Sequence, residues 1–169
     1  MYRLTILILW LGLGSCDLGL DSPNDVSGDY YNSDLMISFR DSSGQDLLDP
    51  DTRGYYDTAQ MSLFYEVDGE LEEVYLENND LPKQFTLLEN VPQNEEPFRL
   101  YVSADLRLTS GNAMTYLQLS PADMDTIVCE YEAGSGKNEN YSYIINVWYN
   151  GEHVFPINDS DIAYFTIEK

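Results

Sequence analysis

The sequence predicts an all-β fold, a single antiparallel β-sandwich, with a closed β-barrel as the alternative. Apolar and polar residues alternate along a series of short runs, which is the pattern of strands with one buried face. Clusters of Gly, Asp, Asn and Ser separate the runs at intervals of about 8–12 residues, as in sandwiches and barrels. One short stretch alone favours a helix, so no helical layer is expected.

Each strand is justified by its own alternation. The cleanest example is 98–106, where Phe98, Leu100, Val102, Ala104 and Leu106 occupy one face. The strands expected, in chain order, are 35–39, 61–67, 70–77, 84–89, 98–106, 114–119, 126–132, 141–149, 153–156 and 162–168.

Turn residues join these strands. Asp68-Gly69 and Asn150-Gly151 each predict a hairpin, because a type I′ turn requires positive φ at both central residues. The polar stretch 41–44 predicts another turn. Ser120-Pro121-Ala122-Asp123 predicts a single helical turn, since Ser caps helices well and Pro suits the first helical position.

The N-terminus predicts an anchor. Arg3 precedes an apolar run over 4–13, followed by Leu13-Gly14-Ser15-Cys16. A helix that spans a membrane needs about 20 apolar residues, and this run is shorter, so the segment is interpreted as a signal peptide. The segment resembles a bacterial lipoprotein signal peptide. The resemblance implies removal of residues 1–15 and lipidation of Cys16.

The organisation follows from this reading. Residues 16–33 are expected to be the lipidated Cys and a flexible tether rich in Asp, Ser, Asn and Gly, and 34–169 one β-sandwich domain. The lipid would be the membrane partner, and the location the cell envelope, anchored to the outer membrane. Both the periplasmic face and the cell surface are consistent with the sequence.

The stretch Phe39-Arg40-Asp41-Ser42-Ser43-Gly44-Gln45-Asp46-Leu47-Leu48-Asp49-Pro50-Asp51-Thr52 follows the signal segment. In that context it resembles small lipoproteins of Bacteroidota. The resemblance covers the signal peptide and about the first third of the domain. It implies an immunoglobulin-like or transthyretin-like sandwich, and it implies no activity and no catalytic residues.

The net charge of the chain limits which classes of partner are expected. The chain has 30 acidic and 8 basic residues and a formal net charge of −22. Nucleic acid is not an expected partner, because binding it requires clustered cations that displace counterions. Asp41, Asp46, Asp49 and Asp51 offer hard oxygen ligands that suit calcium, but their spacing does not match the EF-hand. Turn formation explains them as well, so calcium is a weak candidate and no other cofactor is expected.

Enzymatic activity is not expected. The chain has one histidine, and Cys129 lies in an alternating run that predicts a buried, inert thiol. A glycoside hydrolase with a carboxylate pair is a lesser alternative, because so many acidic residues produce chance pairs.

Aromatic residues give the main binding hypothesis. In 141–149, strict alternation places the odd positions in the core and leaves Trp148 and Asn146 on the other face as a ligand platform. We therefore expect a non-enzymatic protein that binds a glycan or an envelope protein. The alternative is a structural or adhesion subunit that assembles by strand addition. Thr58 and Thr126 follow Asp and precede small or apolar residues, so they are candidate O-glycosylation sites.

Cys16→Ser tests the anchor. We expect the wild-type chain in the membrane fraction of a bacterial host and the variant in the soluble fraction, because several acyl chains hold a protein durably at a bilayer. Fractionation followed by intact mass measures this. Equal membrane retention of both chains would contradict lipidation at Cys16.

Overall fold

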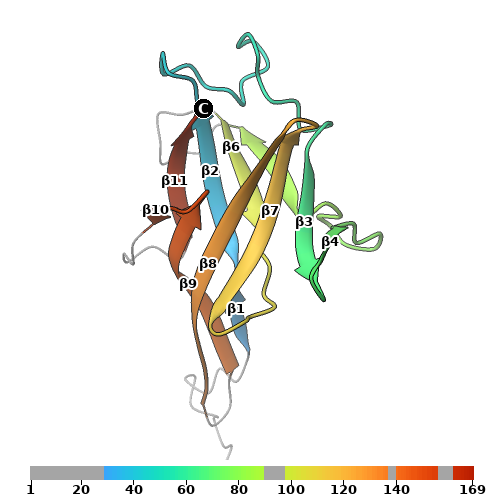
Figure 1. The fold of residues 1–169 in the computed structure, drawn as a ribbon, viewed down its shortest axis with the longest axis vertical. Helices are drawn as coiled ribbons and strands as arrows, with labels where there is room; N and C mark the ends of the chain where they lie inside the picture. The colour runs from blue at the N-terminus through green and yellow to red at the C-terminus, as the bar shows by residue number, and fades with distance from the viewer. Residues whose placement is uncertain (1–28, 90–97, 137–139, 156–161) are drawn as a thin grey trace, which may run out of the picture.

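The computed structural model describes residues 29–89, 98–136, 140–155 and 162–169 (Figure 1). Two mixed β-sheets pack face to face as a sandwich and do not close into a barrel. The predicted sandwich is confirmed and the barrel alternative is wrong. The strands are β1 (Tyr30–Asn32), β2 (Asp34–Arg40), β3 (Ser62–Val67), β4 (Glu70–Glu73), β5 (Phe85–Glu89), β6 (Phe98–Ser103), β7 (Asn112–Ser120), β8 (Asp123–Ser135), β9 (Asn140–Tyr149), β10 (Glu152–Phe155) and β11 (Ala163–Glu168).

The larger sheet has the order β1-β9-β8-β7-β3-β4, with β10 also paired to β9. The smaller sheet has the order β11-β2-β6-β5. Most pairs are antiparallel, as expected, but β1 pairs with β9 and β11 pairs with β2 in parallel. The purely antiparallel expectation is therefore wrong at these two pairs. Tight hairpins enforce antiparallel neighbours, whereas strands far apart in the chain are free of that constraint.

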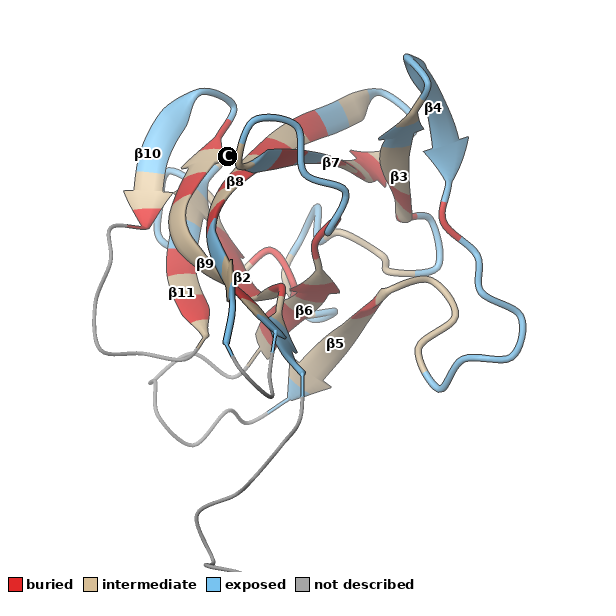
Figure 2. Cartoon of the chain, turned by 90° about the horizontal axis from the view of Figure 1, so that it is seen from below, coloured by how far each residue is buried: buried red, intermediate tan, exposed pale blue. Residues whose placement is uncertain are grey.

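The core lies between the two sheets, where the buried segments face each other in Figure 2. Leu35, Ile37 and Phe39 have no exposed surface, as their alternation predicts. Ile127 and Leu117 oppose them from the larger sheet and are equally buried. Burial of such side chains from both sheets stabilises the sandwich, at about 1.5–3 kcal/mol for each large aliphatic residue.

Both predicted hairpins are confirmed. Asp68 and Gly69 have φ of 53° and 85°, and Asn150 and Gly151 have φ of 50° and 82°. These values are typical of type I′ turns, which match the twist of the flanking strands. The return strand after Asp68-Gly69 ends at Glu73 and does not reach residue 77.

Three local expectations are wrong. Pro121 and Ala122 form the tight turn between β7 and β8 in place of a helical turn, since Ser120 and Asp123 are paired across the ladder. Strand β1 lies inside the stretch 16–33 that was expected to be a tether, and it pairs with β9. Strand β6 ends at Ser103, and Leu106 is 43% exposed outside it.

A β-bulge in β9 changes the orientation of its side chains. Cys129 pairs with Val147 and Glu130 with Asn146, but Tyr131 pairs with Ile144, so Ile145 is the extra residue. After the bulge, Val147 and Tyr149 are buried, as strict alternation predicts.

Before the bulge the alternation is reversed. Ser142 is 6% exposed and Ile144 packs against the core. Tyr141 and Tyr143 stack on each other with ring centroids 6.0 Å apart, and both are only half-buried. Their predicted place in the core is therefore wrong, because the extra residue turns this half of the strand over.

The Cys129 thiol and the Tyr131 side chain are buried in the core, and Tyr65 packs against it half-buried. Cys129 is 1% exposed, and burial raises the pKa of its thiol to about 12. Burial also raises the pKa of Tyr65 to about 12 and that of Tyr131 above its ordinary value. The Tyr131 hydroxyl donates a hydrogen bond of 2.9 Å to the carbonyl oxygen of Asp105. These groups are held neutral in the folded chain, so the prediction of an inert Cys129 is consistent with its surroundings.

Alkaline pH should therefore unfold the protein. Unfolded tyrosine and cysteine ionise near pH 10 and 9, whereas Cys129 and Tyr65 do so near 12 in the fold. Stability from these groups is complete below pH 9 and is lost as pH rises towards 12. Tyr131→Phe should flatten this decline in thermal melts, while Tyr75→Phe, at a residue that is 64% exposed, should leave it unchanged. The same decline in both variants would contradict the assignment.

Candidate functional site

The outer face of the larger sheet carries an aligned row of side chains. Met114 pairs with Val128, Val128 with Trp148, and Trp148 with His153. The row therefore crosses β7, β8, β9 and β10, which lie side by side in Figure 1. The Asn150-Gly151 hairpin sets this register, because its two-residue turn places His153 opposite Trp148.

A polar row lies beside the apolar one. Asn112 pairs with Glu130, and Glu130 pairs with Asn146. The Asn146 amide nitrogen donates a hydrogen bond of 2.8 Å to Glu130 Oε2, and its Oδ1 lies 2.9 Å from His153 Nε2. The amide is held from both sides, so its orientation on the face is fixed. We call Trp148, His153, Asn146 and Glu130 the outer-face cluster.

Trp148 and His153 present a ring surface next to this amide. Their ring centroids are 5.1 Å apart and their planes meet at 35°. Trp148 is half-buried and His153 is exposed. An apolar ring surface flanked by an amide, a carboxylate and an imidazole suits a ligand with an apolar face and several hydroxyl groups. The predicted pair Trp148 and Asn146 is thus brought together by the structure.

Two members of the cluster were not predicted. The sequence places Glu130 and His153 on separate strands, and nothing in their local pattern indicates that they meet at Asn146. The signal was present in part: the Asn150-Gly151 turn fixes the pairing of His153 with Trp148. Glu130 lies opposite Asn146 in the last regular pair before the register shift of the β8–β9 ladder, and the sequence did not indicate the register of this pair.

The carboxylates of three of the four aspartates considered for calcium accept hydrogen bonds within turns. Asp41 Oδ1 accepts hydrogen bonds from the Ser43 hydroxyl and from the backbone nitrogens of Gln45 and Ser43, and these bonds lower the pKa of Asp41. Asp46 and Asp49 each accept one from the backbone nitrogen two residues ahead, in Leu48 and Asp51. Within the described residues, no group of three or more His, Cys, Asp or Glu side chains has an arrangement able to hold a metal ion. The turn interpretation explains the geometry without a metal.

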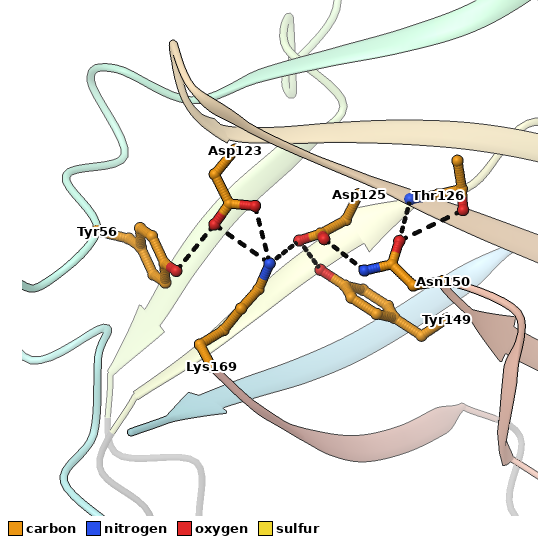
Figure 3. A network of polar contacts seen from close by, with 7 residues as sticks. All are labelled: Tyr56, Asp123, Asp125, Thr126, Tyr149, Asn150 and Lys169. Atoms are coloured by element: carbon orange, nitrogen blue, oxygen red, sulfur yellow. Dashed lines mark hydrogen bonds and ion pairs between the residues drawn. The ribbon is translucent and has the colours of Figure 1, made fainter. Parts of the chain in front are cut away.

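A second polar cluster lies at the C-terminal end of the sandwich (Figure 3). Lys169 Nζ lies 3.0 Å from Asp123 Oδ1 and 2.5 Å from Asp125 Oδ2. The Tyr56 hydroxyl donates to Asp123 Oδ2, and the Tyr149 hydroxyl donates to Asp125 Oδ2 at 2.6 Å. Burial, followed by these hydrogen bonds, raises the pKa of both tyrosines.

Asp123 and Asp125 are the carboxylate pair to consider for the alternative of a glycoside hydrolase. The remaining oxygen, Asp125 Oδ1, accepts a hydrogen bond of 2.6 Å from the amide of Asn150. All four carboxylate oxygens of Asp123 and Asp125 therefore have partners within the chain. The arrangement ties the last residue to β8 and to the β9–β10 turn, which is a structural role.

The candidate modification sites differ in their local structure. Thr58 lies in a turn between β2 and β3, where it is half-buried. Thr126 lies in β8, and its backbone nitrogen donates a hydrogen bond of 2.8 Å to Asn150 Oδ1. Thr126 is thus held in a ladder, whereas Thr58 lies in a turn, and both residues are half-buried. Cys16 lies outside the described residues, within which no helix is long and apolar enough to cross a membrane.

The edge strands of the two sheets are where assembly by strand addition would take place. In the described part of the chain, the edge strands β1, β4, β5 and β10 have three to five residues each, and β11 has six. Three of the four residues of β4 are glutamates, and all four are exposed. Short and charged edges oppose the addition of a foreign strand.

The fold and the outer-face cluster define an all-β sandwich protein with a polar and aromatic sheet face. Comparison of the chain with protein-family models, with curated proteins and with solved structures found no match. The function is therefore inferred from the geometry of the chain itself.

Lys169→Met tests the C-terminal cluster. We expect a loss of about 3 kcal/mol in the free energy of unfolding, at the lower end for a broken buried ion pair, because Asp125 stays buried while Lys169 and Asp123 are partly exposed. Arg53→Met, the same charge change at an exposed turn, should change stability little. Chemical denaturation measures both, and equal effects would contradict the structural role.

Proposed function

We propose that this chain is a lipid-anchored envelope protein of the small Bacteroidota lipoprotein kind, with an immunoglobulin-like or transthyretin-like sandwich that binds glycans without catalysis. The observation that supports binding is the outer-face cluster. A tryptophan and a histidine ring lie beside an asparagine amide whose orientation is fixed by 2.8 and 2.9 Å contacts. Pre-organised polar groups beside an aromatic surface lower the entropy cost of binding a polyhydroxylated ligand.

The charge favours a neutral glycan. Glu130 belongs to the cluster, and the chain has a net charge of −22. An acidic polysaccharide would meet like charge on this face, which is costly where both groups lose water. Neutral sugars present an apolar ring face to Trp148 and hydroxyl groups to Asn146 and Glu130.

The outer face of the sheet suits a polysaccharide more than a single sugar. The row from Met114 to His153 spans four strands, and neighbouring strands lie about 4.8 Å apart. A row of this length matches several residues of a polysaccharide. The location at the cell envelope and the anchor at Cys16 would place this face where such polymers occur.

Trp148 fluorescence tests the proposal. The whole chain with Trp10→Phe and Cys16→Ser has Trp148 as its single tryptophan. We expect a saturable change in its emission with at least one neutral polymer among laminarin, xylan, galactomannan and soluble starch, and none with polygalacturonate. His153→Ala and Asn146→Ala, in the same background, should each weaken binding about fivefold to tenfold.

Affinity electrophoresis provides the matched control without fluorescence. Trp148→Ala should lose retardation by the same polymer, and Tyr75→Ala, which removes an exposed aromatic residue elsewhere, should keep it. If no neutral polymer alters the Trp148 emission, or if Trp148→Ala is retarded as strongly as the unchanged chain, glycan binding at this face is wrong.

A further inference from the structure

The sandwich is open at the end where the chain enters the fold. Strand β8 continues to Ser135, and strand β9 begins at Asn140. At this end both strands extend beyond the start of β2 and the end of β6 (Figure 1). On the inner side of this overhang, Tyr31 pairs with Ser142, and Ser142 pairs with Ala133. This is the end that Figure 2 shows from below.

A cavity of about 380 Å³ lies there. Its walls are the residues Tyr31, Leu106, Leu108, Ala133, Tyr141 and Ser142. Leu106 and Leu108 come from the segment after β6 and are 43% and 37% exposed. Arg107 between them turns the other way, to Asp105 and over the ring of Tyr65. The two leucines thus present their side chains to the cavity and the cation does not.

One polar group in the wall has no partner in the described part of the chain. The Ser142 side chain belongs to a residue that is 6% exposed, and its hydroxyl forms no hydrogen bond there. A buried hydroxyl without a partner destabilises a fold, and the great majority of such groups are hydrogen-bonded. Ser142 lines the cavity, so rotation of its side chain about the Cα–Cβ bond can bring the hydroxyl to a molecule bound there.

The geometry points to a binding site for a small neutral amphiphile, with an aliphatic or aromatic body against Leu106, Leu108 and Tyr31 and one hydrogen-bonding group at Ser142. The volume is within the range of small-molecule sites, which are mostly apolar with few polar groups. Among the residues that the structure describes, none of those lining the cavity is basic, and the chain is strongly acidic, so an anionic ligand gains no partner there. This site is separate from the outer-face cluster, because Ser142 and Trp148 lie on opposite faces of the sheet.

Binding of N-phenyl-1-naphthylamine tests the inference, since this probe is neutral, largely apolar and has a single N–H. We use the whole chain with Cys16→Ser, so that no attached lipid competes. We expect a saturable rise in probe fluorescence at one probe per chain. Decanol should displace the probe, and decanoate should do so at least tenfold less well.

Two variants locate the site. Ser142→Ala should weaken probe binding about twofold to tenfold, by loss of one hydrogen bond, and should raise the melting temperature of the free protein. Leu106→Asp should weaken binding at least tenfold, and Leu71→Asp, at an equally exposed leucine on β4, should not. Thermal melts check that both aspartate variants fold.

Several results would overturn the inference. These are the absence of saturable binding, equal binding by Leu106→Asp and Leu71→Asp, or displacement by decanoate as effectively as by decanol. Binding that appears only after removal of residues 1–28 would also overturn it, because the occupant would then be the chain itself.

Discussion

The β-bulge at Ile145 decides what each face of β9 offers. With unbroken alternation, Ser142, Asn146 and Trp148 would share one face, as even positions of one strand. The extra residue turns the first half of the strand over, so Ser142 faces inwards and Asn146 and Trp148 face outwards. The apolar cavity at one end depends on this insertion, whereas Asn146 and Trp148 lie on the regular side of the bulge, where alternation alone places them outwards. Bulges commonly re-aim side chains in this way.

The two polar clusters differ in how much bonding capacity they leave for a ligand. Around Lys169, every oxygen of Asp123 and Asp125 is occupied by an internal donor, which suits a clamp at the end of the chain. In the outer-face cluster, Glu130 Oε2 and the two ends of the Asn146 amide are engaged. A carboxylate accepts up to about four hydrogen bonds and an amide about four in all, so capacity remains there for a ligand. This difference is the physical basis for assigning stability to one cluster and binding to the other.

Much of the fold was predictable from local chemistry. Asp68-Gly69 and Asn150-Gly151 specify turns with positive φ, and the alternation around Ile37 specifies a buried face. Leu106 shows the limit of such patterns: it continues the alternation of β6, yet it lies beyond the strand at the open end of the sandwich. Alternation records which side of the chain is apolar, but where the opposite sheet ends is a tertiary property. The bulge and the parallel pairing of β1 are likewise set by partner strands distant in sequence.

Cysteine labelling across β9 tests the bulge most directly. The background is the whole chain with Cys16→Ser, in which Cys129 is buried with a thiol pKa raised to about 12 and reacts slowly. Single cysteines at Ser142, Tyr143, Asn146 and Val147 are then labelled with a maleimide at pH 7. We expect fast labelling at 143 and 146 and at least tenfold slower labelling at 142 and 147. Fast labelling at 142 with slow labelling at 143 would show unbroken alternation, and the proposed cavity site at Ser142 would lose its basis.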